Sequence, residues 1–252
     1  MRLFVLNLGN TTLSGGIFSG TRLISKFRIP SDLPTRRLAA GIAARLRRPP
    51  DLAVLCSVVP SLTPRVAGTL RRSTGAGPLV LDALSDHGLS IGYGRPGELG
   101  ADRVAAALGA RTLFPGRNLV VVDCGTATTV TALDSAGRIH GGAIMPGVAL
   151  WSEMLARRTA QLPLVTGQRS PRAVGRSPSE AIASGIHHGH VGAISHLIDR
   201  IAREAFGVRP YQILGTGGNA PRFRREKLFT RLEPDLILHG LRAFAARIHD
   251  HV

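Results

Sequence analysis

The sequence contains few cysteines and no long apolar run. Its 252 residues include only two cysteines, Cys56 and Cys124. Each lies in or beside an apolar, strand-like run, which indicates packing rather than redox chemistry, and no cysteine cluster is present that would hold a metal. No apolar run approaches the roughly 20 residues of a membrane span, and the start MRLFVLNLGN turns polar too early for a signal peptide. We therefore expect a cytoplasmic protein without membrane association.

Lysine is nearly absent, so the positive charge comes almost entirely from arginine. Lys and Arg number 32 against 16 Asp and Glu, a formal net charge of +16, and only Lys26 and Lys227 are lysines. Such a charge is typical of proteins that bind nucleic acid. The densest runs, TRRLAAGIAARLRRPP and RFRREKLFTRL, alternate charged and apolar residues at helical spacing, as solvated helix faces do. We expect no nucleic-acid partner, and attraction of anionic substrates and weak polyanion binding stay open as alternatives.

The sequence does contain a repeated pattern of strands. With 44% hydrophobic residues, the chain suits one large α/β domain or two domains that share a cleft. The order strand, glycine turn, strand, turn, strand occurs at residues 3–29 and again at 119–146. The sequence therefore predicts an α/β fold with two similar halves, 1–115 and 116–252, which face each other across a cleft. The last predicted helix, from Leu236 to His249, is a candidate to cross back to the first half.

Each half begins with an apolar strand that ends in Asn or Asp, followed by glycine and hydroxyl residues. The two segments are LFVLNLGNTT and LVVVDCGTATT. Aligned position by position, the pairs are Asn7 and Asp123, Gly9 and Gly125, Asn10 and Thr126, and Thr12 and Thr128. Glycine lets the backbone approach a ligand closely, and turn N–H groups with the hydroxyls of Thr11, Thr12, Thr126 and Thr128 suit phosphate oxygens. One such turn alone would equally fit an ordinary hairpin, but the duplication predicts a site for phosphoryl transfer.

Two further segments fit a nucleotide-dependent reaction. In YQILGTGGNA, Gly215, Gly217 and Gly218 leave room for a base or ribose, although a simple turn into a helix is the alternative. In GADR, Asp102 stands beside Arg103 at a predicted loop-to-helix junction. The carboxylate suits the removal of a hydroxyl proton, and the guanidinium suits a substrate carboxylate. The alternative is a helix-capping Asp102 with Arg103 in a surface ion pair.

A group of histidines and a tryptophan are weaker candidates. The segment IHHGHVGAISHLIDR holds His187, His188, His190 and His196, but no nearby acid completes a metal site, so we expect solvated or subunit-contact histidines. Trp151 and Met154 are expected in the core or in a dimer contact, with the lining of a substrate tunnel as the alternative.

Seven motifs together resemble one known family over essentially the whole chain. They are NLGNTT, GADR, VVDCGTATT, GGAIMPG, LPLV, EAIASGI and GTGGNA, in this order. This set resembles the type III pantothenate kinases, which belong to the actin-like, Hsp70-like and sugar-kinase-like ATPases with duplicated ribonuclease-H-like domains. The resemblance implies transfer of the ATP γ-phosphate to the primary hydroxyl of pantothenate, the first step of coenzyme A synthesis. It also implies a homodimer that uses Mg²⁺ and a monovalent cation, K⁺ or NH₄⁺.

The resemblance also implies roles for individual residues. Asp102 would be the general base, and Asp123 would bind the monovalent cation. The residues that would contact pantothenate are Tyr93, Gly100, Ala101, Asp102 and Arg103. The residues that would bind ATP are Asn7, Leu8, Gly9, Asn10, Thr11, Thr12, Leu13, Ser14, Thr126, Gly217 and Gly218.

Four positions depart from the family pattern. Asn7 replaces an Asp near the Mg²⁺-phosphate end of the site, which removes a negative charge that Mg²⁺ prefers. Arg95 in YGRP replaces an Asn, Thr166 replaces a Glu, and Ser177-Pro178 replaces Asn-Thr, which removes a hydroxyl expected to touch pantothenate and a backbone N–H. Three interpretations stay open: a working kinase with compensating residues, a paralogue for another hydroxylated acid, and a non-catalytic binding or regulatory protein.

Overall fold

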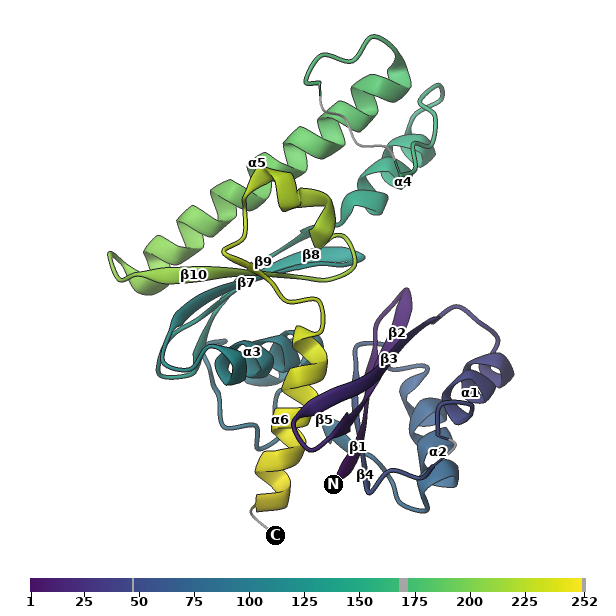
Figure 1. Cartoon of the computed structure of the whole chain (residues 1–252). Helices are drawn as coiled ribbons and strands as arrows, with labels where there is room; N and C mark the ends of the chain where they lie inside the picture. Colours follow the sequence, from purple (N-terminus) through teal and green to yellow (C-terminus); the bar gives the residue numbers. More distant parts are fainter. Residues whose placement is uncertain (47, 168–171, 251–252) are drawn as a thin grey trace. The chain divides into compact units, whose positions relative to one another are not determined.

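The computed structural model of this chain describes residues 1–46, 48–167 and 172–250 (Figure 1). Two compact units are present. Unit 1 holds Met1–Pro115, Gly137–Ile139 and the chain from Asp235 onward, and unit 2 holds Gly116–Ala136 and His140–Pro234. The division into domains at residue 115 stays a prediction. None of the helices in the described ranges has the length and apolar character needed to cross a membrane.

Unit 1 is built on a five-stranded sheet. Its strands lie in the order β3-β2-β1-β4-β5, and β1, β2 and β3 form an antiparallel meander. Strands β4 and β5 run parallel to β1. The elements are β1 (Arg2–Leu8), β2 (Thr12–Ser19), β3 (Arg22–Pro30), α1 (Thr35–Ala43), β4 (Leu52–Ser57), α2 (Thr63–Thr74), β5 (Leu79–Leu81), β6 (Ser90–Ile91), the 3₁₀ helix η1 (Pro96–Glu98), α3 (Ala101–Leu113) and α6 (Leu236–Asp250).

Helices cover the sheet of unit 1. The apolar side chains of β1 alternate between its two faces, as the two-residue period of a strand requires. Phe4, Leu6 and Leu8 pack with Leu38 and Ile42 of α1 and with α2 in one buried cluster. Helix α6 contacts β1, β2, β4 and β5, and α3 packs against α6 and β4. This burial fixes the ends of β1 and β4, where the first candidate turn begins.

Unit 2 has a second mixed sheet. Strands β7 and β8 form an antiparallel hairpin, β10 runs parallel to β7, and the full order is β11-β10-β7-β8-β9-β6. Strand β6 pairs with Arg138 and Ile139, which group with unit 1. The elements are β7 (Asn118–Cys124), β8 (Ala127–Leu133), β9 (Arg138–Pro146), α4 (Val148–Arg158), α5 (Pro178–Phe206), β10 (Tyr211–Thr216), the 3₁₀ helix η2 (Ala220–Glu226) and β11 (Arg231–Leu232).

The long helix α5 covers one face of this sheet, as Figure 1 shows. It begins at an N-cap, where the Ser177 hydroxyl accepts the Glu180 N–H at 3.2 Å and Pro178 occupies the first turn. Ile194, Ile198 and Ala202 pack on the apolar residues of β7 and β8. Spacing of four residues keeps such side chains on one helix face.

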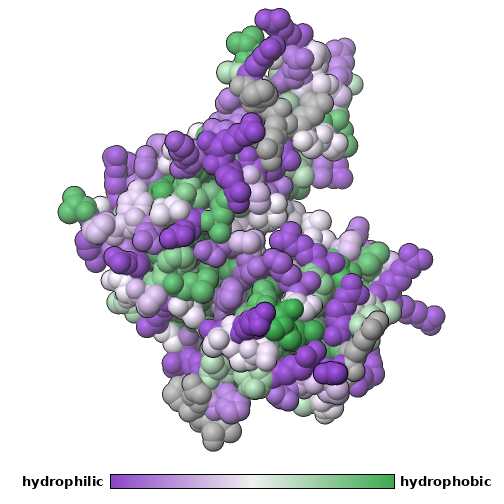
Figure 2. Space-filling view, in the orientation of Figure 1, coloured by the Kyte–Doolittle hydropathy of each residue, from purple (hydrophilic) through white to green (hydrophobic). Residues whose placement is uncertain are grey.

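The strands predicted within residues 3–29 and 119–146 and the helix predicted from Leu236 to His249 are confirmed to within a few residues. The strand β6, of two residues, and the single-turn helix η1 lie between β5 and α3. Elements this short carry no hydrophobic period, so the pattern of apolar residues could not reveal them. On the face drawn in Figure 2, hydrophilic residues are spread over both units, and hydrophobic ones form separate small groups.

Candidate active site

The first glycine turn joins β1 to β2 in unit 1. Asn7 and Leu8 end β1, and Thr12, Leu13 and Ser14 begin β2, with Asn7 paired to Ser14. The Gly9 N–H donates to the Thr12 carbonyl at 3.1 Å, and Ser31 holds the turn from outside by donating its hydroxyl to the Gly9 carbonyl at 2.8 Å. Asn10 and Thr11 are exposed at its tip. The turn is therefore fixed by backbone bonds while its tip is open to a ligand.

Asn7 is a buried amide at the base of this turn. Its side chain is 9% exposed, and within the described ranges its Oδ1 has no hydrogen-bond partner. A buried acceptor without a partner costs about 1–3 kcal/mol, so such groups usually mark a site for a ligand or water. The role of Asn7 as a contact of ATP stays a prediction.

The GADR segment begins α3, also in unit 1. Asp102 is half-buried in the first turn, and its carboxylate accepts the Arg103 N–H at 2.8 Å. Arg103 donates from Nη1 to the Tyr93 hydroxyl, and its guanidinium lies 5.7 Å from the centre of the Tyr93 ring. The structure thus brings Tyr93, Asp102 and Arg103 together. Arg103 is 6% exposed, so it is not in a surface ion pair.

The Asp102 carboxylate affects the pKa of Cys56, which lies on β4 beside Asn7 of β1. Burial raises the pKa of Asp102, and the N–H and positive charge of Arg103 oppose part of this rise. Burial also raises the pKa of the Cys56 thiol, and the negative charge of Asp102 raises it further. Cys56 pairs with Asn7 in the sheet. Asp102 therefore lies near the ends of β1 and β4, where the first glycine turn begins.

The second glycine turn joins β7 to β8 in unit 2, beside the GTGG segment that follows β10. Thr216 pairs with Asp123 in the parallel strands. Gly217 has φ of +85°, and a Cβ there would lie 2.2 Å from Asp123 Oδ1, so only glycine fits. Asn219 donates its N–H to the Cys124 carbonyl at 2.9 Å and its side-chain amide to the Gly125 carbonyl at 3.3 Å. The β7–β8 turn and the segment after β10 therefore lie side by side, and they contain Asp123, Thr126, Gly217 and Gly218.

Asp123 also affects the neighbouring thiol. Burial and then the negative charge of Asp123 raise the pKa of Cys124 to about 12, so this thiol stays protonated. Cys124 is fully buried. Its packing role agrees with the sequence analysis.

The two glycine turns are not identical, and the second is one residue shorter. In the first, Leu8 pairs with Leu13, whereas in the second Cys124 pairs with Thr128. The aligned residues Thr12 and Thr128 therefore occupy different places. Thr128 is 1% exposed and bonds to His190 Nε2 at 3.0 Å, so the prediction that its hydroxyl binds phosphate is wrong.

His190 is a second residue that the sequence analysis placed incorrectly. It was expected at the surface or in a subunit contact, but it is fully buried in unit 2. Its ring stacks on Phe223 at 5.2 Å and meets the Trp151 ring at 6.0 Å, edge to face. Burial and then the positive charge of Arg222 lower the pKa of His190 to about 4, so the imidazole is neutral at pH 7. The sequence did hold a signal for this burial: His190 lies four residues from both Ile186 and Ile194, which is the spacing of one helix face.

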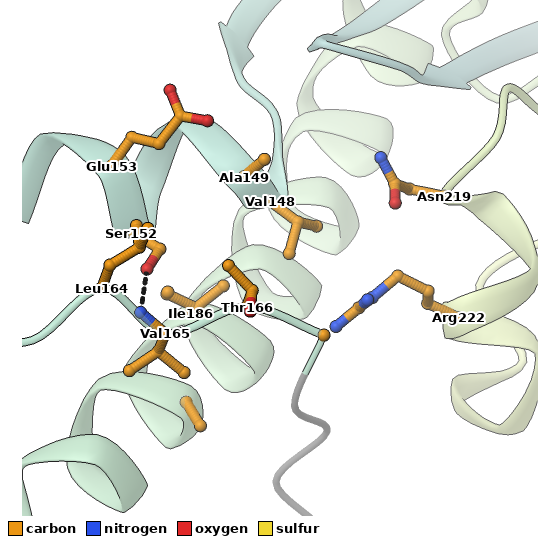
Figure 3. A pocket seen from close by; sticks show the side chains of 12 residues that line it. Val148, Ala149, Ser152, Glu153, Leu164, Val165, Thr166, Ile186, Asn219 and Arg222 are labelled. Carbon is orange, nitrogen blue, oxygen red and sulfur yellow. Dashed lines mark hydrogen bonds between the residues drawn. The ribbon is translucent and has the colours of Figure 1, made fainter.

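A pocket of about 140 Å³ opens in unit 2 between α4, α5 and η2 (Figure 3). Residues 164–167 form a further wall of the pocket. The Val165 N–H donates to the Ser152 hydroxyl at 2.8 Å, which holds this segment against α4. Asn219 and Arg222 extend toward it from the η2 side (Figure 3). The residues that line it are Val148, Ala149, Ser152, Glu153, Leu164, Val165, Thr166, Gly167, Ala183, Ile186, Asn219 and Arg222.

The other departures from the expected motifs lie at exposed positions. Arg95 pairs with Glu98 at 3.1 Å on the surface of unit 1. Thr166 is exposed and lines the pocket of unit 2, and Pro178 begins α5. Pro178 thus has a structural reason, since proline suits the first turn of a helix. Within the described ranges no three His, Cys, Asp or Glu side chains gather as a metal site.

The two units define a mixed α/β fold with a glycine turn at the start of each sheet. Solved structures support the fold: the ethanolamine utilization protein EutJ from Carboxydothermus hydrogenoformans has a TM-score of 0.57 at 12% identity, over 97% of this chain and 90% of that one. ROK hexokinase from Thermus thermophilus has a TM-score of 0.50 at 14% identity, over 98% of this chain and 100% of that one. The predicted fold class is confirmed.

Sequence comparison is more specific. The model of the type III pantothenate kinase family matches residues 3–200. The type III pantothenate kinase of Legionella pneumophila (strain Corby) is 37% identical over 250 residues, which cover 96% of this chain and 98% of the relative. Type III pantothenate kinase 1 of Francisella tularensis subsp. holarctica (strain OSU18) is 38% identical over 245 residues, 94% of this chain and 96% of the relative. The chain belongs to the type III pantothenate kinase family, and a kinase family implies ATP and a divalent metal.

Proposed function

We propose that this chain transfers the γ-phosphate of ATP to the primary hydroxyl of pantothenate, giving 4′-phosphopantothenate in the first step of coenzyme A synthesis. Family membership carries the proposal, because the match includes both glycine turns and the GADR segment. A regulatory role and a kinase for another hydroxylated acid are not favoured, since the relatives that match over almost the whole chain bear the pantothenate kinase name.

In this proposal the acceptor is held by unit 1. Asp102 accepts the proton of the pantothenate hydroxyl as its oxygen attacks the γ-phosphorus. Burial raises the pKa of Asp102, so the carboxylate holds a proton more strongly than an exposed Asp does. Arg103, held against Tyr93, pairs with the pantothenate carboxylate. Gly100 and Ala101 contact the same substrate.

ATP is held by the glycine turns in this proposal. Residues 7–14 and Thr126 donate to its phosphates, and Gly217 and Gly218 leave room for its base or ribose. Mg²⁺ binds chiefly through phosphate and water oxygens with one or two protein oxygens, and the buried Asn7 Oδ1, which has no partner within the described ranges, suits that place. The bound ion supplies charge neutralisation on the phosphoryl group. Asp123 holds the monovalent cation, K⁺ or NH₄⁺.

We also propose a cytoplasmic homodimer. Ile144, Met154, Leu164 and Val174 are each more than half exposed, on β9, α4 and the chain after α4. Large apolar side chains in such positions suit a protein contact. Light scattering of the purified chain tests the dimer, and Met154→Lys is expected to shift the mass toward the monomer.

The experiment that tests the function is a pantothenate-dependent assay of ADP release. Purified protein with ATP, Mg²⁺ and K⁺ should release ADP only when pantothenate is added, and mass spectrometry should find one phosphate on pantothenate for each ADP. The control acid is β-alanine, which has the carboxylate of pantothenate but no hydroxyl. ADP release at the same rate with β-alanine, or with no acid, would contradict the proposal.

A further inference from the structure

A single buried imidazole lies behind the β7–β8 turn. Nε2 of His190 and the hydroxyl of Thr128 share a hydrogen bond of 3.0 Å, and both side chains are buried. Thr128 pairs with Cys124, and this pair closes the turn that contains Gly125 and the exposed Thr126. His190 lies on α5, 62 residues further along the chain than Thr128. The long helix therefore holds the base of the turn through one side-chain hydrogen bond.

The ring of His190 also contacts the segment that follows β10. It stacks on Phe223 of η2, with 5.2 Å between the ring centres and 19° between the ring planes. Asn219, just before η2, donates its N–H to the Cys124 carbonyl at 2.9 Å and its side-chain amide to the Gly125 carbonyl at 3.3 Å. The element that packs on the imidazole thus holds two carbonyls of the same turn.

A third contact of the ring is with the start of α4. Trp151 meets His190 edge to face, with 6.0 Å between the ring centres, and its indole N–H donates to the Pro146 carbonyl at 3.0 Å. The next residue, Gly147, donates its N–H to the Thr126 carbonyl at 3.0 Å. His190 therefore contacts all three of these segments, and each of them bonds to the turn or forms part of it.

Packing alone does not explain a histidine at this place. Nδ1 of His190 is buried, and it has no hydrogen-bond partner among the described residues. A buried polar atom without a partner lowers the stability of the fold, so a phenylalanine ring would pack here at a smaller cost. What phenylalanine could not provide is the hydrogen bond of Nε2 to the Thr128 hydroxyl.

We infer that His190 is a positioning residue for the phosphate donor, because through Thr128 it fixes the β7–β8 turn and with it Thr126. Groups that bind a reacting ligand need to be held to within about 0.5 Å, and hydrogen bonds from the residues behind them do this. The inference rests on the proposed function, which gives Thr126 its contact with ATP. His190 itself touches no substrate and acts only through the turn.

The test separates the position of the turn from the stability of the fold. Thr128→Val and His190→Phe each remove one partner of the hydrogen bond and keep the shape of the side chain, and a double variant removes both partners. Each single variant leaves a buried polar atom unpaired, so its unfolding midpoint in urea should fall, and the double variant should recover part of this loss. Binding of ADP with Mg²⁺, measured by calorimetry, should be about three- to tenfold weaker in all three variants.

Two further variants are controls. Thr128→Ser keeps the hydroxyl and should bind ADP as the wild type does. Ile198→Val removes one methylene group from a residue buried on the same helix, two turns beyond His190. It should lower the unfolding midpoint without changing the affinity for ADP.

The inference is overturned if the ADP affinity of the double variant recovers together with its unfolding midpoint, because the role of His190 would then be packing alone. ADP binding equal to the wild type in both single variants would overturn it as well. Calorimetry with ADP needs no pantothenate, so it does not depend on the acceptor. A wild-type chain that binds ADP but never phosphorylates pantothenate would refute the proposed function and leave this inference intact.

Discussion

His190 Nε2 lies 3.0 Å from the Thr128 hydroxyl, and both side chains are buried in unit 2. Thr128 pairs with Cys124 at the base of the second glycine turn. The other ring nitrogen of His190, Nδ1, is buried without a partner in the described part of the chain. Protonation there would place a cation among the rings of Phe223 and Trp151 and near Arg222. The packing of the turn therefore depends on a neutral imidazole.

The first prediction is that stability falls as the pH falls from 6.5 to 4. The pKa of His190 is lowered from 6.5 to about 4 in the folded chain, so between these values the unfolded chain binds more protons. The free energy of unfolding then decreases with decreasing pH, by up to about 3 kcal/mol once pH 4 is passed. Urea unfolding at a series of pH values measures this. The free energy of unfolding of His190→Gln, which has no titrating ring, should fall much less over the same pH range.

His196→Gln is the control for this measurement, because His196 is exposed on the same helix. Its pH profile should follow the wild type. Parallel profiles for the wild type and His190→Gln would show that another group causes the loss.

The second prediction concerns Asp102→Asn. An amide cannot accept the hydroxyl proton, so kcat should fall by about 10²- to 10⁴-fold. ADP affinity and the unfolding midpoint should stay close to the wild type, because the substitution removes a buried charge and keeps the shape. Glu98→Gln, an exposed acid just before α3, is the control and should retain full activity. Because burial raises the pKa of Asp102, activity of the wild type should decline on the acid side at a higher pH than an ordinary Asp would give.

The third prediction is that Asn7→Asp strengthens binding of the metal-nucleotide complex. A carboxylate adds a negative charge that Mg²⁺ prefers, and the Asn7 Oδ1 is buried without a partner in the described ranges. We expect ADP to bind several-fold tighter with Mg²⁺ and more weakly without it, because the new charge then repels the phosphates. Gln161→Glu, an exposed change from amide to acid outside the glycine turns, is the control and should bind ADP as the wild type does. A variant that responds equally with and without Mg²⁺ would contradict this role.

Much of the fold followed from the sequence because both sheets begin with regular apolar strands. The strand patterns of residues 3–29 and 119–146 fixed two meanders with a glycine turn in each. Within each unit the structure brings residues of different motifs together: Tyr93 contacts Arg103, and Gly217 lies beside Asp123. The contact of Gly217 with Asp123 follows from the parallel pairing of β10 with β7. The contact of Tyr93 with Arg103 forms at the start of α3.

What the sequence could not give depends on side-chain surroundings. The alignment matched Thr12 with Thr128, but the shorter second turn moves Thr128 into the core, and a one-residue change of register reverses the face of a strand residue. His190 looked like a surface residue because three other histidines surround it. The pocket wall combines α4, α5 and η2, which are distant in sequence, so no motif marks it.

The last prediction concerns Gly217→Ala. At φ of +85° a side chain is strained by about 1 kcal/mol, and a Cβ would also lie 2.2 Å from Asp123 Oδ1, so the carboxylate must move. Gly116 is the matched control, because its φ is +69° and a Cβ there would meet no atom within 4 Å. Gly116→Ala should lose only the stability that corresponds to the backbone strain, about 1 kcal/mol, and should bind ADP normally. Gly217→Ala should unfold at lower urea and bind ADP about tenfold more weakly in calorimetry. Equal behaviour of the two variants would mean that Asp123 does not need its present position for nucleotide binding.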